Sequence, residues 1–177
     1  MKKDYLKYYF LEDYLFNDIK RSFQEKGYLT SQEFFCIVIW KANRAKSKIL
    51  HRLLSRRNGL GNVIKEISSE IAVAPNKYER LRILLEKWQF RLPMASAILT
   101  VLYPDDFTIY DVRVCKELNI KDFSNKKSCI NDYFKIFLPG VKGVKKNKTL
   151  RENDRYLWGR SFYYDLMNFL KTATVKR

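Results

Sequence analysis

The feature that most constrains this fold is the helical spacing of apolar side chains along most of the chain. Apolar residues recur every three or four positions over residues 10–26, and a second such face runs through residues 62–73. This spacing is typical of helices that place one side against a core. No stretch shows the strong alternation that a half-buried strand requires, and only Ile109-Tyr110 is a candidate for a short extended segment. The sequence predicts an all-α fold of seven or eight helices.

Several helix boundaries are marked by local signals. Thr30 and Glu33 have the spacing of a capping box, as do Thr149 and Glu152. The helix that follows Thr30 starts with a nearly all-apolar half, which we expect to be buried, and then becomes basic. Pro93 stands where a helix begins, a position at which the missing N–H costs little. Further helices are expected over residues 78–88, 93–103, 112–118 and 129–138, and from 149 onward.

Length and residue usage indicate one domain without a prosthetic group. The chain has 177 residues, of which 46% are hydrophobic, so residues 1–177 are expected to share one core. The three cysteines, Cys36, Cys115 and Cys129, show no CxxC spacing, which argues against a disulfide framework, a zinc ribbon or an all-cysteine iron–sulfur cluster. His51 is the only histidine. We therefore expect no metal and no cofactor.

The charge of the chain points to an anionic partner. The formal net charge is +16 and the isoelectric point is about 9.8. Repulsion at this charge is relieved by a polyanion such as DNA or RNA, or by an anionic membrane surface. The basic helix lacks a clean face for membrane insertion, and the longest apolar run, residues 34–40, is too short to span a bilayer. We expect no membrane partner and a cytoplasmic location, nucleoid-associated if the partner is DNA.

Two segments concentrate the positive charge. No acidic residue lies between Glu33 and Glu66, a span that contains Lys41 and Arg44. A second group lies in an expected flexible loop over residues 139–148 and consists of Lys142, Lys145, Lys146 and Lys148. Such surfaces neutralise phosphates and release their counterions, which drives binding that does not depend on base sequence. The alternative is a solvated face that keeps the protein soluble.

The most specific pattern in the chain runs from Leu84 to Leu118. A helix ends at Trp88, a tight turn follows, and a second helix carries the small residues 95–97. After a Pro-Asp-Asp loop, Asp111 stands at the start of a third helix. This order of elements resembles the helix-hairpin-helix DNA glycosylase superfamily. The resemblance covers roughly residues 10–170 and implies a helical, DNA-binding fold with its hairpin at about residues 78–103.

In that superfamily the hairpin holds a DNA phosphate through backbone amides and the N-terminus of its second helix. The usual turn is Gly-x-Gly, whereas this chain has Gln89-Phe90-Arg91. The resemblance makes these three residues candidate DNA contacts, with Arg91 compensating through its side chain. The alternative is an ordinary pair of antiparallel core helices.

Asp111 matches the position of the catalytic aspartate of these glycosylases. In their chemistry the base is flipped out of the stack, and the carboxylate stabilises an oxocarbenium-like sugar or activates water. Members that also cleave the strand carry a Schiff-base lysine early in the second hairpin helix, where this chain has Pro93. The resemblance therefore implies a monofunctional glycosylase. Asp111 has a second reading, as the N-cap of the helix over residues 112–118.

Four short stretches narrow the resemblance to a group of poorly characterised bacterial proteins in the superfamily. They are Trp40-Lys41-x-x-Arg44, residues 92–99, residues 110–113 and residues 150–158. The resemblance makes Lys41 and Arg44 candidate phosphate anchors, and it makes Trp40 and Trp158 candidate walls of a base pocket. The alternative reading assigns both tryptophans to the core and both basic residues to a helix surface.

Three hypotheses follow. The first is a protein that binds DNA without sequence specificity and hydrolyses the glycosidic bond of a modified or damaged base, with Asp111 as the catalytic carboxylate. The second is a non-catalytic DNA-binding module of the same fold, which the missing hairpin glycines and the missing lysine favour. The third is an RNA-binding or protein-interaction factor. Oligomeric state is left open.

Overall fold

The computed structural model describes residues 5–56, 59–145 and 148–174, and these residues form helices and no strands. A 3₁₀ turn over Asn43–Ala45 joins α4 to α5, and π-helical segments over Tyr14–Ile19, Ile83–Lys87 and Tyr133–Phe137 follow α2, α7 and α10. The helices are α1 (Leu6–Tyr9), α2 (Leu11–Asp13), α3 (Lys20–Lys26), α4 (Ser31–Ala42), α5 (Lys46–Leu54), α6 (Leu60–Val73), α7 (Lys77–Arg82), α8 (Leu92–Leu102), α9 (Val112–Glu117), α10 (Cys129–Asp132), α11 (Leu138–Lys142) and α12 (Leu150–Thr174). The all-α prediction is confirmed for the described residues.

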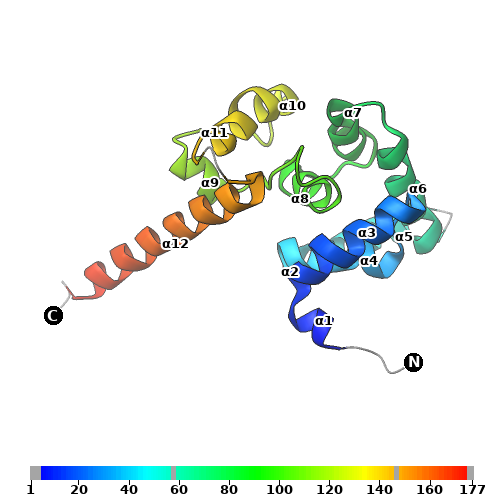
Figure 1. Ribbon diagram of the computed structural model, residues 1–177, viewed down its shortest axis with the longest axis horizontal. Helices are drawn as coiled ribbons and strands as arrows, with labels where there is room; N and C mark the ends of the chain where they lie inside the picture. Colours follow the sequence, from blue (N-terminus) through cyan, green and yellow to red (C-terminus); the bar gives the residue numbers. More distant parts are fainter. Residues whose placement is uncertain (1–4, 57–58, 146–147, 175–177) are drawn as a thin grey trace.

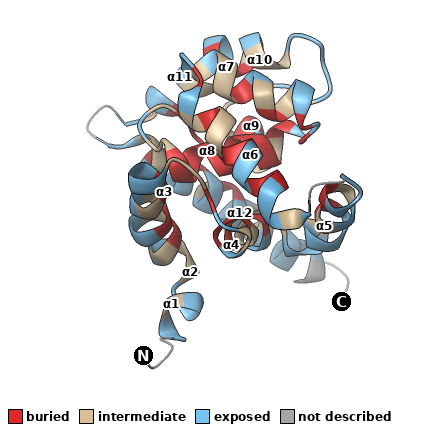
Figure 2. Ribbon diagram, turned by 90° about the vertical axis from the view of Figure 1, so that its right-hand side faces the viewer, coloured by how far each residue is buried: buried red, intermediate tan, exposed pale blue. Residues whose placement is uncertain are grey.

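Helix α8 lies at the centre of the molecule, with α2 to α6 on one side and α9 to α12 on the other (Figure 1). It is the most deeply buried helix, as the red ribbon in Figure 2 shows. Ala95 and Ala97 are fully buried within it, and such small side chains let neighbouring helices approach closely. α4 packs against α8, and its apolar stretch is buried in part: Phe34, Ile37 and Val38 are inaccessible to solvent, whereas Ile39 is 39% exposed.

Both predicted capping boxes are present. The Thr30 hydroxyl accepts from the Glu33 amide at 3.3 Å, and the Glu33 carboxylate accepts from the Thr30 amide at 2.8 Å. Thr149 and Glu152 repeat this arrangement at 3.2 and 2.9 Å. Each box satisfies amides that the first turn of a helix leaves without an intrahelical partner. The starts of α4 and α12 are therefore set by residues that are close in sequence.

The loop predicted over residues 139–148 is shorter than expected. Helix α11 continues through Pro139 to Lys142, and the buried side chain of Val141 anchors it. Proline breaks the α-helical hydrogen-bond ladder, and here a π-helical turn lies immediately before it. Lys142 therefore belongs to a helix. Lys145 lies after it, and Lys146 is outside the described residues.

Residues 107–111 are extended but form no strand, and buried hydroxyl groups take the place of a neighbouring strand. The Tyr133 hydroxyl donates to the Thr108 carbonyl at 2.5 Å and accepts from the Thr108 amide at 2.9 Å. The Ser96 hydroxyl accepts from the Tyr110 amide at 2.9 Å. Buried backbone groups need such partners, so this segment is held in one path up to Asp111.

Among the described residues, no helix is both long and apolar enough to cross a bilayer.

Candidate functional site

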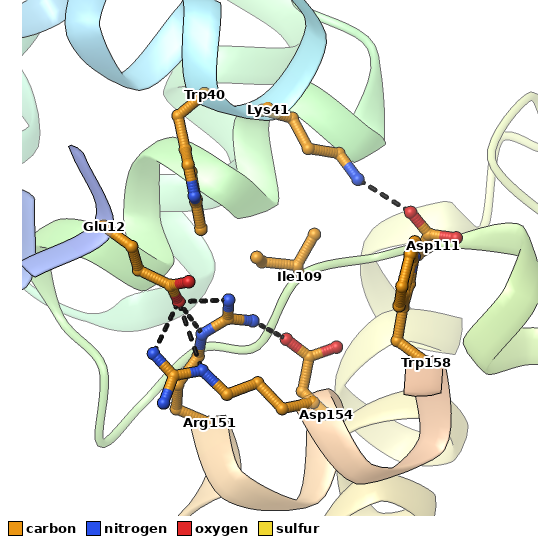
Figure 3. A pocket seen from close by; sticks show the side chains of 9 residues that line it. Glu12, Trp40, Lys41, Ile109, Asp111, Arg151, Asp154 and Trp158 are labelled. Carbon is orange, nitrogen blue, oxygen red and sulfur yellow. Dashed lines mark hydrogen bonds and ion pairs between the residues drawn. The ribbon is translucent and has the colours of Figure 1, made fainter. Parts of the chain in front are cut away.

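A pocket of about 530 Å³ opens between α4, α12, the end of α2 and the extended segment before α9 (Figure 3). Its volume falls in the range of about 300–1,000 Å³ that is typical of small-molecule sites. The pocket brings together candidate residues from opposite ends of the chain. Its walls are formed by Glu12, Trp40, Lys41, Ile109, Asp111, Arg151, Asp154, Arg155 and Trp158.

Asp111 occupies the N-cap of α9 and also faces the pocket. One carboxylate oxygen accepts from the Arg113 amide at 3.0 Å, and the other lies 2.9 Å from the Lys41 ammonium. The two proposed roles of Asp111 therefore coincide structurally, because one oxygen caps the helix and the other points toward the cavity.

Trp40 and Lys41 are placed by the last turn of α4. The Lys41 side chain is only 14% exposed, so its ion pair with Asp111 is largely shielded from solvent. Trp40 is half-buried: its ring packs edge-on against Phe16 and has the Arg151 guanidinium 5.2 Å from its centre. α4 ends at Ala42, so the expected basic continuation of this helix lies in the 3₁₀ turn and α5, and Lys41 is the only basic residue of α4. The last turn of α4 delivers an aromatic wall and a cation to the same cavity.

Trp158 is not a core residue. It is 44% exposed, stacks on Phe162 at 5.6 Å between ring centres, and forms the wall of the pocket beside Asp111 (Figure 3). The reading of Trp158 as a core aromatic is therefore wrong. Trp40 and Trp158 instead give the pocket two aromatic surfaces, on either side of the Ile109 side chain.

A second group of charges closes the side of the pocket nearest α2. The Arg151 guanidinium contacts both Glu12 and Asp154, and Arg155 reaches Glu12 at 2.8 Å. Burial acts to raise the pKa of Glu12, but hydrogen bonds from Arg151 and Arg155 outweigh it and lower that pKa below its usual value. The network ties α2 to the first turns of α12, so the pocket depends on both ends of the chain.

Asp154 is the most strongly perturbed group of the pocket. Its side chain is 4% exposed, and burial raises the pKa of its carboxyl to about 6, with Arg151 and Lys41 acting in the opposite direction. A carboxyl with such a pKa changes charge close to neutral pH. When Asp154 is protonated, the pocket carries one more net positive charge.

This pKa predicts a pH-dependent stability difference for Asp154→Asn. The folded-state pKa lies above the unfolded value near 3.8, so the native state holds the proton more tightly and wild-type stability falls as pH rises from about 4 to 6. The neutral amide has no such dependence. We expect the stability of the variant relative to wild type to increase by up to about 3 kcal/mol between pH 4 and 7, as measured by urea unfolding. A constant difference across this range would contradict the assignment.

A second pocket, of about 430 Å³, lies beside the turn between α7 and α8. Arg91 and Lys48 contribute cations to it, and both are exposed. Its apolar lining includes Ile49 and Met94. Lys41 lines this pocket as well as the first one, so the two cavities adjoin at a single lysine.

The turn itself differs from expectation at two positions. Phe90 lines this second pocket together with Gln89 but is only 4% exposed, and its amide donates to the Leu84 carbonyl at 2.9 Å, so that amide is already occupied. Gln89 adopts a positive φ of 53°, a region that favours glycine, and its carbonyl accepts from Arg52 at 2.5 Å. A glutamine thus takes the backbone shape that the expected glycine would favour.

The remaining candidates lie apart from the two pockets. Arg44 is exposed on the 3₁₀ turn after α4 and is not among the residues that line either cavity. The carbonyls of Lys142 and Lys145 accept from the Asn153 amide at 3.5 and 3.2 Å, and the Lys145 ammonium lies 3.8 Å from the Tyr156 ring centre. These lysines are thereby tied to α12.

The sequence did not single out Glu12 at all, and it gave Asp154 only a helix-pairing role. Glu12 sits in an ordinary amphipathic helix, and its significance comes from a contact with Arg151, 139 positions away. The pocket residues of α12 could have been found from the sequence, because residues 150–158 belong to the stretches on which the resemblance rests. No comparable signal marks Glu12.

Comparison of this chain with family models, with curated proteins and with solved structures finds no match.

Proposed function

We propose that the protein binds DNA through its backbone phosphates and hydrolyses the N-glycosidic bond of a modified or damaged base that enters the pocket between Trp40 and Trp158. The observation that carries the proposal is the arrangement around Lys41. Lys41 lines both pockets. The pocket beside the α7–α8 turn carries the exposed cations Lys48 and Arg91, and the other pocket contains the Asp111 carboxylate, which is largely shielded from solvent. A phosphate bound in the pocket beside the turn would place its nucleotide at the pocket that contains Asp111.

The charges of the Asp111 pocket support a base as its occupant, in preference to a phosphate. Lys41 contacts Asp111, Arg151 contacts Glu12 and Asp154, and Arg155 contacts Glu12. The cations are therefore balanced by carboxylates within the pocket. Indole rings stack on flat rings, and base–aromatic stacking is worth about 1–3 kcal/mol per base. A flipped base satisfies these conditions.

In the proposed reaction Asp111 faces the sugar of the flipped nucleotide. As the bond to the base breaks, positive charge develops on the sugar ring, and the carboxylate stabilises that charge or takes a proton from the attacking water. Lys41 acts as a positioning residue that holds the Asp111 carboxylate toward the cavity. The fold assignment that goes with this proposal is a helix-hairpin-helix arrangement over about residues 78–103, within a single domain.

The direct test is a base-release assay on duplexes that carry uracil, 8-oxoguanine, alkylated purines or mismatches. Abasic products are revealed by alkaline cleavage of the strand. We expect release from at least one duplex and no strand cleavage before alkali treatment, because Pro93 stands in place of the Schiff-base lysine. Absence of release from every substrate would count against the catalytic part of the proposal.

The phosphate-binding part has its own prediction. Replacing both Lys48 and Arg91 by alanine should weaken duplex binding and reduce the slope of log affinity against log salt by about 2, since each lost phosphate contact removes about 0.9. Fluorescence anisotropy at several salt concentrations measures the slope. The matched control, Lys121→Ala with Lys135→Ala, removes the same charge from exposed sites that line neither cavity. Equal effects of the two pairs would indicate a net-charge effect only.

The second candidate function is a DNA-binding module without chemistry. The buried Phe90 and the absence of hairpin glycines favour it, because both reduce the number of backbone amides that can approach a phosphate. Salt-sensitive binding of duplexes without release of any base would support this alternative.

A further inference from the structure

The outer part of α12 exposes an apolar face. The helix projects away from the rest of the molecule in Figure 1, and residues 162–172 of it include no buried residue. Phe162, Leu166, Phe169 and Leu170 are 47%, 42%, 67% and 47% exposed. Their spacing of i, i+4, i+7 and i+8 places them on one side of the helix. Within the described residues, this side of the helix has large apolar groups facing solvent.

An exposed apolar side is not expected of a helix that extends into solvent without a packing partner. A helical segment of about a dozen residues is marginally stable in water unless its apolar side packs against something. Contiguous exposed apolar patches of this kind mark interaction sites more often than isolated exposed leucines do. The packing of α12 on α9 and α11 occupies a different side of the helix, on which Leu157 and Ser161 are buried.

The charge of the segment identifies the kind of partner. From Trp158 to Thr172 the charged residues are Arg160, Asp165 and Lys171. Arg160 pairs with Glu117 at 2.5 Å, and Asp165 pairs with Arg113 and Lys116 at 2.5 and 2.9 Å. In a chain with a net charge of +16, this nearly neutral surface suits a protein partner better than a polyanion. It is also a place where two copies can meet with little repulsion.

The available area matches what a dimer needs. Apart from the pocket residue Trp158, five large apolar side chains are exposed on this side of α12: Phe162, Tyr163, Leu166, Phe169 and Leu170. Each exposes roughly 100 Å², since such side chains have about 150–250 Å² in total. This amounts to about 500 Å² per copy and about 1,000 Å² for a pair, which is the area that a biological interface needs to reach.

We propose that the protein forms a homodimer in which the exposed faces of two α12 helices pack against each other in antiparallel orientation. A two-fold axis produces this self-complementary contact. Antiparallel packing also places the two highly charged globular bodies at opposite ends of the helix pair, whereas parallel packing would bring them side by side. This dimer is independent of the proposed glycosylase activity.

Sedimentation equilibrium of the full chain tests the proposal. At about 0.3 M salt, which screens repulsion between the copies, we expect the mass to approach twice 21.3 kDa as protein concentration rises through the micromolar range. The double variant Leu166→Glu, Phe169→Glu should raise the dimer dissociation constant at least about 100-fold. At a concentration where wild type is also monomeric, its circular dichroism should match that of wild type, since glutamate is a good helix former.

The matched control is Val73→Glu, which makes the same kind of change at an apolar residue that is 81% exposed on α6. It should leave the dimer intact. A wild-type protein that stays monomeric at every concentration overturns the proposal, and so does a dimer that survives the double variant. If the double variant instead loses DNA affinity at concentrations where wild type is monomeric, nucleic acid covers this face and the dimer assignment is wrong.

Discussion

Asp111→Asn is expected to lower the rate of base release by about 10³-fold, the scale at which positioned charges and acid–base groups act in enzymes. Asparagine has nearly the same shape and is a good N-cap, so the hydrogen bond from the Arg113 amide and the start of α9 should persist. What is lost is the negative charge facing the sugar. Single-turnover rates of abasic-site formation, read after alkaline cleavage, measure the effect.

Two controls separate chemistry from structure in this experiment. Asp105→Asn makes the same change at an exposed residue of the loop before α9 and should release base at the wild-type rate. Duplex affinity should not fall in Asp111→Asn, because the change removes a negative charge beside Lys41 and adds no repulsion toward phosphate. Release that continues at the wild-type rate in Asp111→Asn would remove this residue from the chemistry and leave it as a helix cap paired with Lys41.

The second large effect is expected for stability. Tyr133→Phe removes the hydroxyl that both donates to and accepts from the backbone of Thr108, and it leaves two buried backbone groups without these partners. Each such group costs about 1–3 kcal/mol, so the free energy of unfolding should fall by about 3 kcal/mol or more. Burial raises the pKa of Tyr133 well above its usual value, which keeps this hydroxyl in the donating form. Urea denaturation measures the change.

Tyr78→Phe is the matched control, because Tyr78 is 40% exposed on α7. Its effect on unfolding should stay within about 0.5 kcal/mol. The Tyr133 variant should also impair base release more than its loss of stability explains, because residues 107–111 carry Asp111 to the pocket. A variant that unfolds like wild type would show that other contacts suffice to hold this extended segment.

Much of the helical framework is readable from the sequence because its determinants are local. The capping boxes at Thr30 and Thr149 each act over three residues, and the structure begins α4 and α12 immediately after them. The apolar spacing over residues 10–26 likewise predicts a helix, and the structure has helical turns from Leu11 to Lys26. The loop over residues 139–148 was predicted wrongly at its start, because the buried contact of Val141 outweighs the local preference of Pro139.

The candidate site was predictable only in part. Trp40, Lys41, Asp111 and Trp158 were singled out by resemblance, and the structure brings all four into one pocket. Phe90 is only 4% exposed, which its position in the turn did not reveal, because the sequence does not show whether the ring faces the core. Arg44 lies three residues after Lys41, yet it is exposed beyond the end of α4. Two basic residues that are close in the sequence can therefore differ in exposure, because the helix ends between them.

By itself, the sequence determined the helical class, most helix boundaries and the excess of positive charge, since these depend on residue type and short-range spacing. Tertiary structure decided which charges meet. Lys41 and Asp111 are 70 positions apart, and Glu12 and Arg151 are 139 positions apart. The pKa of Asp154 also depends on the fold, because burial and proximity to other charges arise only when distant helices pack together and exclude water.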